Sequence, residues 1–136
     1  MLNSSRSNAL CERRSAMNEK DEAREYRINM EAVVDAHDSE ERAMGWYYYL
    51  DDKIMFPFSA KCIAADKRTP LELGERVKVL DMSGEALCEH DMYVDISWND
   101  KLLAIPLAQV LPEKAGEDTI EAVMDWHYWK AQGYLL

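Results

Sequence analysis

The segment from Val33 to Phe58 constrains the fold most, because it contains the start, the buried stripe and the end of one helix. Asp38 and Glu41 have the spacing of a capping box, in which each side chain accepts a hydrogen bond from the backbone N–H of the other residue. Apolar side chains then recur at helical spacing, at Ala43, Tyr47, Leu50 and Ile54. This stripe is typical of a helix face turned toward a core. Since Pro57 ends the helical region, we predict a helix over residues 39–52.

Short stretches of alternating apolar and polar residues lie on both sides of this helix and predict strands. They cover residues 28–36, 58–65, 75–82, 92–98 and 102–105. Asn99-Asp100 is a tight-turn pair between the last two, and residues 112–116 are expected to form a linker. A second helix is predicted over residues 117–131, with Gly133 as its C-cap. The pattern predicts an α+β fold: a small SH3-like antiparallel β-barrel with two flanking helices.

The first 24 residues differ in composition from the rest of the chain. They are rich in Ser, Asn, Arg and Glu and show no sustained apolar period. We therefore predict a disordered leader over residues 1–24 and a single domain over residues 25–136. The chain has no apolar run long enough to cross a bilayer and no signal-peptide core, so a cytoplasmic location is expected.

The net charge of the chain limits the kinds of molecule that it is expected to bind. Acidic residues outnumber basic residues 26 to 16, which gives a net charge of −10. A surface this negative repels phosphate backbones and anionic lipids, so neither nucleic acid nor a membrane is expected as a partner. Divalent cations and a basic protein are the partners that the charge favours.

Catalysis has little support in the sequence. The three histidines, His37, His90 and His127, lie in no catalytic or zinc-binding motif. Cys11, Cys62 and Cys88 are scattered without a C-x-x-C pair, which predicts reduced thiols, buried in a core. We therefore expect the protein not to be an enzyme.

Calcium binding is better supported, although not by an EF-hand. Calcium takes six to eight oxygen ligands, which bunched carboxylates supply. The nearest EF-hand-like loop starts at Asp81, with Ser83 and Glu85 at its third and fifth positions. Its sixth position is Ala86 instead of Gly and its twelfth is Met92 instead of Glu, so any calcium site is of another kind.

Three groups of acids are candidates for that site. The first is the corner before the first predicted helix, where Asp38 and Glu41 are also explained by capping. The second is the second predicted helix, whose acids share one face at i, i+4 and i+8. The third is at the end of the first helix, where the macrodipole disfavours negative charge and either a cation or Lys53 would compensate. In order, the groups are Asp35, Asp38, Glu40 and Glu41; Glu117, Glu121 and Asp125; and Asp51 and Asp52.

Four longer stretches resemble the cyanobacterial calcium-binding protein family of the CcbP type. They are VDAHDSEERAMGWYYYLDDKIMFPFSAKC, PLELGERVKVLDM, MYVDISWNDKLLAIPLAQV and DTIEAVMDWHYWKAQGY. The resemblance implies a small acidic protein that binds Ca²⁺ through non-EF-hand sites, as a calcium buffer or a calcium-responsive regulator. The acids in the matching stretches are the predicted ligands: Asp35, Asp38, Glu40, Glu41, Asp51, Asp52, Glu121 and Asp125.

One alternative of another class stays open from the residues. An SH3-like interaction module would dock a peptide or basic protein partner on exposed aromatic side chains, with the acids serving only steering and solubility. Calcium binding predicts a response to Ca²⁺ much larger than the response to matched ionic strength, whereas an interaction module predicts equal responses.

Overall fold

The computed structural model of the chain describes residues 20–134 and 136. Its elements in chain order are α2 (Glu22–Arg27), the π-helical turn η2 (Ile28–Ala32), α3 (Ser39–Lys53), β1 (Phe58–Cys62), β2 (Arg76–Met82), the 3-10 turn η3 (Glu85–Cys88), β3 (Tyr93–Trp98), β4 (Lys101–Pro106), the 3-10 turn η4 (Leu107–Gln109), β5 (Val110–Lys114) and α4 (Glu117–Ala131).

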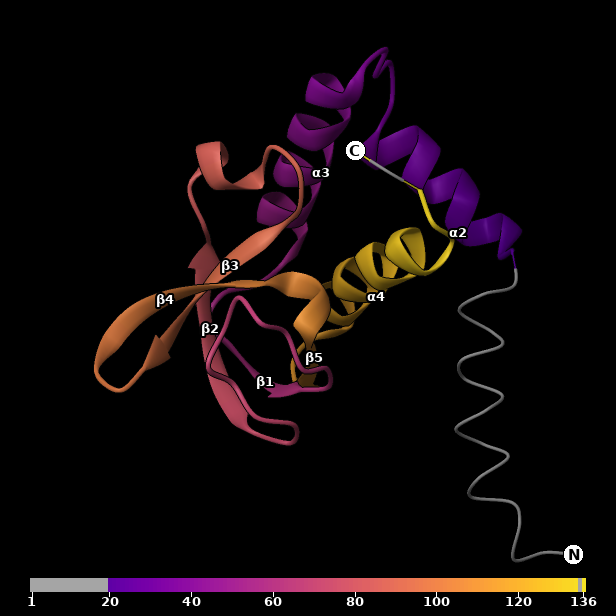
Figure 1. Cartoon of the computed structure of the whole chain (residues 1–136). Helices are drawn as coiled ribbons and strands as arrows, with labels where there is room; N and C mark the ends of the chain where they lie inside the picture. The colour runs from indigo at the N-terminus through magenta and orange to yellow at the C-terminus, as the bar shows by residue number, and fades with distance from the viewer. Residues whose placement is uncertain (1–19, 135) are drawn as a thin grey trace, which may run out of the picture.

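The five strands form one antiparallel sheet in the order β4-β3-β2-β1-β5. The predicted α+β class is thereby confirmed. The predicted closure into an SH3-like barrel is not observed, because β4 and β5 are the two edges and no strand pairing in the described part of the chain joins them. Figure 1 shows the β3–β4 hairpin projecting away from the helices.

The core lies between the sheet and the two long helices. Trp46 of α3 and Trp126 of α4 are fully buried, with ring centroids 5.0 Å apart in an edge-to-face arrangement. Trp129 packs on the same ring of Trp46 at 5.5 Å. The sheet contributes its inward-facing residues, among them Val79 and Ile96, both with no exposed surface. This aromatic cluster fixes α3 and α4 against each other, and so positions the acids that both helices carry.

The predicted strand over residues 28–36 is wrong, because its first half is helical. Asp21 caps the N-terminus of α2 by accepting from the Arg24 N–H, and the chain continues without interruption into η2. Ile28 and Ala32 are buried four residues apart, which is also a helical period, whereas Met30 is 54 % exposed. The alternating apolar pattern fitted both periods, and burial selects the helical one. Within the described residues, the α-helix α2 thus precedes the two long helices that were predicted.

The boundaries at both ends of the domain also differ from prediction. Helix α2 begins at Glu22, inside the predicted leader, whose residues 1–19 lie outside the described part of the chain. The predicted linker over residues 112–116 is wrong, since Val110–Lys114 is strand β5. Pro112 suggested a break, but β5 is an edge strand that, among the described strands, pairs with β1 alone. A residue without an N–H is tolerated at such an edge.

Other local predictions are confirmed. The two long helices occupy residues 39–53 and 117–131, and Asn99 and Asp100 have the positive φ angles of 49° and 62° that a tight hairpin turn needs. Cys62 and Cys88 are free and buried; Cys11 lies outside the described residues. No helix in the described residues is long and apolar enough to cross a membrane.

Candidate metal site

The corner before α3 serves mainly as a helix cap. The Asp38 carboxylate accepts from the Glu41 N–H at 2.8 Å, half of the predicted capping box. Asp35 is exposed with a φ of 57°, in the left-handed region, and turns the chain after η2. Glu40 lies in the same first turn of α3 but lines a hollow together with Glu85 and Glu89 of another segment. The carboxylates of this corner therefore lie apart and do not surround a single position.

The row of acids on α4 does not fit a free metal site. Asp125 has no exposed surface and accepts from the Arg24 Nη1 at 2.7 Å, from the Arg27 Nη2 and Nε at 2.7 and 3.0 Å, and from the Tyr49 hydroxyl at 2.6 Å. Glu121 pairs with Lys53 and, at 3.5 Å, with Arg27. Both carboxylates already have cationic partners. The sequence did not reveal this, because the two arginines lie about a hundred residues away from Asp125 along the chain.

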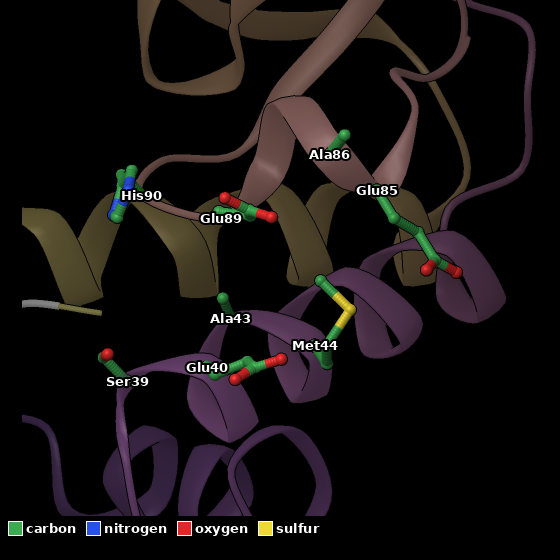
Figure 2. Close-up of a pocket in the computed structure, with 8 residues that line it drawn as sticks. All are labelled: Ser39, Glu40, Ala43, Met44, Glu85, Ala86, Glu89 and His90. Carbon is green, nitrogen blue, oxygen red and sulfur yellow. The ribbon is translucent and has the colours of Figure 1, made fainter.

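The structure brings other acids together between α3 and η3. One face of α3 presents Glu40 near its start and Asp51 near its end, and η3 lies along this face. A hollow of roughly 550 Å³ separates the two elements. It is lined by Ser39, Glu40, Ala43, Met44, Glu85, Ala86, Glu89 and His90. Figure 2 shows Glu40 on α3 across this hollow from Glu85 and Glu89. We call this hollow, together with the residues Tyr47, Asp51 and Asp81, which do not line it but are linked to Glu85 through their effect on Tyr47, the α3–η3 groove; its Asp51 end is the part around Tyr47.

Tyr47 lies close enough to three carboxylates at the Asp51 end of the groove for their charges to act on its phenol. Burial raises the pKa of its phenol, and the nearby negative charges of Asp51, Glu85 and Asp81, with the Cys88 thiol, raise it further. Three carboxylates from α3, η3 and β2 thus act on one hydroxyl. The neighbouring Tyr48 hydroxyl donates to the Glu85 carboxylate at 2.7 Å and holds it beside α3.

Of the predicted ligands, Asp51 lies in this cluster, and Asp81 and Glu85 join it although they were not predicted. Both lie in the rejected EF-hand loop, and no pattern in the sequence relates them to Asp51. Asp52 lies in the same last turn of α3 and lines a second, more open hollow of roughly 800 Å³ with Glu31 and Asp51. Asp51 lines this second hollow and is not among the residues that line the first.

The groove contains the type of oxygen ligand that a hard cation binds. Carboxylate oxygens, together with the hydroxyl of Ser39, are the ligands that Ca²⁺ prefers. In the described residues no three Asp, Glu, His or Cys side chains lie close enough together to hold one ion, so the carboxylates line the groove without converging. The helix dipole distinguishes its two ends, because Asp51 lies in the last turn of α3 and Glu40 in the first. The negative C-terminal end of the dipole favours a cation near Asp51.

Comparison with known proteins agrees with this chemistry. A family model for calcium binding of the CcbP type matches residues 26–130 of the 136. The crystal structure of Anabaena CcbP is similar, with 44 % sequence identity and a TM-score of 0.78, covering 87 % of this chain and 97 % of that one. A structure of a calcium-binding protein in its calcium-binding form has 43 % identity and a TM-score of 0.75, covering 85 % and 94 %. A comparison with curated protein sequences finds no match. The chain thus belongs to the CcbP family of calcium-binding proteins.

Proposed function

We propose that the protein binds Ca²⁺ at the Asp51 end of the α3–η3 groove, with Asp51, Asp81 and Glu85 as its principal ligands. The observation that carries this assignment is that the negative charges of Asp51, Glu85 and Asp81 all raise the pKa of the Tyr47 phenol, so all three carboxylates lie within electrostatic range of one side chain. Membership of a calcium-binding family and the helix dipole at Asp51 both support it. In this proposal the protein is not an enzyme and works in the cytoplasm.

Each part of the groove has a definable role in this proposal. Asp51, Asp81 and Glu85 come from three elements, and their mutual repulsion opposes close approach in the free protein. When bound, Ca²⁺ supplies the positive charge that removes this repulsion. Tyr48 holds the Glu85 carboxylate beside α3 through its hydroxyl, which reduces the conformational freedom that binding must restrict.

This geometry supports a calcium-responsive protein as well as a buffer. Because the ligands lie on α3, η3 and β2, binding joins elements that are separate in the chain. Any ligand that binds only the folded state stabilises it, by about 2.7 kcal/mol at a concentration one hundred times its Kd. We expect millimolar Ca²⁺ to raise the melting temperature, and an unchanged melt would contradict the proposal.

The ligand assignment is tested by calorimetric titration of chelator-stripped protein with Ca²⁺. Asp51→Asn and Glu85→Gln each remove one ligand charge, and we expect each to weaken binding by about tenfold or more, corresponding to about 1.4 kcal/mol. Asp35→Asn is the matched control, since it removes the same charge from an exposed acid outside the groove. Equal losses of Ca²⁺ affinity in Asp51→Asn and Asp35→Asn would refute a specific site here. The binding heat should also persist at high salt; its complete loss there would likewise refute the site.

A further inference from the structure

The outer surface of the sheet carries a row of exposed side chains that the calcium proposal does not use. Ser59, Lys78 and Ser97 are direct cross-strand partners on β1, β2 and β3. Ser59 also pairs with Lys114 of β5, and Ser97 with Leu102 of β4. Directly opposed residues point to the same face of a sheet, and all five residues are exposed. The row therefore crosses the whole sheet.

A second cross-strand pair adds charge to this row. Lys61 of β1 lies opposite Arg76 of β2, and both are exposed. We call Lys61, Arg76, Lys78 and Lys114 the basic sheet face. Part of it borders a shallow hollow of roughly 550 Å³, whose lining includes both serines and three of the four cations.

Most of these cations have no acidic partner. Arg76 pairs with Glu113, its Nε lying 2.9 Å from the carboxylate. Lys61, Lys78 and Lys114 form no ion pair within the described residues. By contrast, Arg24, Arg27 and Lys53 between the helices are all neutralised by carboxylates. The four cations, with Glu113 as their one carboxylate partner in the described residues, thus gather on one part of the outer sheet face of a chain with a net charge of −10. The opposed acids Asp81 and Asp95 lie further along β2 and β3.

The shape and the apolar parts of this surface select among anionic partners. Leu102 at one end of the row is 70 % exposed, and a free phosphate would leave it in water. A long nucleic acid would extend beyond the face onto the acidic remainder of the molecule, which repels it. A short protein segment with acidic and apolar side chains satisfies both the lysines and Leu102.

We propose that the basic sheet face docks an acidic segment of a partner protein, with an apolar side chain of that segment against Leu102. Five strands spaced about 4.8 Å apart make a row roughly 19 Å long, which an extended segment of about six residues spans. Acidic side chains alternate along such a segment, and they meet the lysines while the intervening serine hydroxyls of the row serve as additional hydrogen-bond donors. The surface shares no residue with the proposed calcium ligands.

The proposal is tested by fluorescence anisotropy with a labelled peptide of alternating glutamates and leucines, titrated with the full chain. We expect saturable binding that weakens steeply with salt. The double variant Lys78→Glu and Lys114→Glu should weaken it by about tenfold or more, because like charges then face the peptide. The single variants Lys78→Glu and Lys67→Glu change the net charge equally. Lys67 is the control, because it lies in an exposed loop outside the face, and its reversal should change peptide affinity less than about twofold. Leu102→Ser should weaken the leucine-containing peptide more than a peptide of glutamate and serine.

Each competing result has a defined meaning. Duplex DNA or inorganic phosphate that binds more tightly than the peptide would overturn the choice of an acidic protein segment. Equal losses in the Lys67 and Lys78 single variants would mean that net charge alone governs binding, and would overturn the assigned surface. Absence of saturable peptide binding at low salt would overturn the proposal outright. Unchanged circular dichroism and an unchanged calcium titration in each variant establish that the fold is intact.

Discussion

Replacing Asp125 by Asn tests whether this residue belongs to the structural ion cluster and not to the calcium site. The carboxylate is fully buried and accepts four hydrogen bonds from Arg24, Arg27 and Tyr49. Asn keeps the shape but has one acceptor oxygen and an NH₂ group that would face N–H and O–H donors. The substitution therefore leaves two guanidinium groups without their shared counter-charge.

The magnitude follows from how deeply each partner is buried. Breaking a buried ion pair by removing one partner costs about 3–5 kcal/mol. The Arg24 and Arg27 side chains keep 23 % and 22 % of their surface exposed, so water compensates part of their charge. We therefore expect Asp125→Asn to lower the free energy of unfolding by about 3 kcal/mol, at the lower end of this range.

The assay is urea unfolding followed by tryptophan fluorescence, which the buried Trp46 and Trp126 report. Glu121→Gln is the matched control, because its carboxylate is 42 % exposed and should cost less than about 1 kcal/mol. Calcium affinity, measured below the unfolding transition, should be unchanged in Asp125→Asn. A loss of stability similar to that of the control, or a calcium affinity lowered as much as by Asp51→Asn, would refute the assignment.

Three further outcomes are expected. Gly45→Ala should destabilise the fold by about 1–3 kcal/mol in urea unfolding, because a Cβ at this position would clash with the Ala32 carbonyl. Ala normally favours a helix, so a stabilised variant would contradict this packing. Burial lowers the pKa of His127, whose Nε2 lies 2.8 Å from the Val110 carbonyl oxygen. Below about pH 6.5 the His127 imidazole therefore binds a proton more readily in the unfolded chain than in the folded protein, and the free energy of unfolding should fall as the pH is lowered through that value. This pH dependence should be weaker in His127→Gln. Identical pH profiles for the two proteins would contradict the prediction. Tyr49→Phe should lower the free energy of unfolding by about 1–2 kcal/mol. In the unsubstituted protein, a spectroscopic titration should give the Tyr49 phenol a pKa of about 12, raised mainly by burial and then by the hydrogen bond to Asp125. An ordinary pKa near 10 would contradict this buried hydrogen bond.

Local signals in the sequence predicted most of the elements. The capping residue Asp38, the apolar stripe through Leu50 and the turn pair Asn99-Asp100 each act over a few residues, and the structure confirms the helix and the hairpin that they predict. The failures came where one pattern fits two structures. Residues 28–36 satisfy both a strand and a helix period, and only tertiary burial of Ile28 and Ala32 decides between them.

The candidate site was less accessible from the sequence, because it depends on contacts between distant segments. Asp125 looked like a potential ligand in its row of acids, and only the fold shows that Arg24 and Arg27 neutralise it. Asp81 and Glu85 looked like a failed EF-hand, and only the packing of β2 and η3 on α3 brings them, with Asp51, into electrostatic range of Tyr47. Charge composition predicted the class of ligand, but not which carboxylates would meet.

The most direct test of the central assignment is a crystal structure of the calcium-loaded protein in which anomalous scattering locates the ion. We predict one ion at the Asp51 end of the α3–η3 groove, within the 2.3–2.6 Å typical of calcium–oxygen bonds to Asp51 and to at least one of Asp81 and Glu85. An ion held instead by Asp35 and Asp38, or by the acids of α4, with the groove carboxylates unmoved, would contradict it.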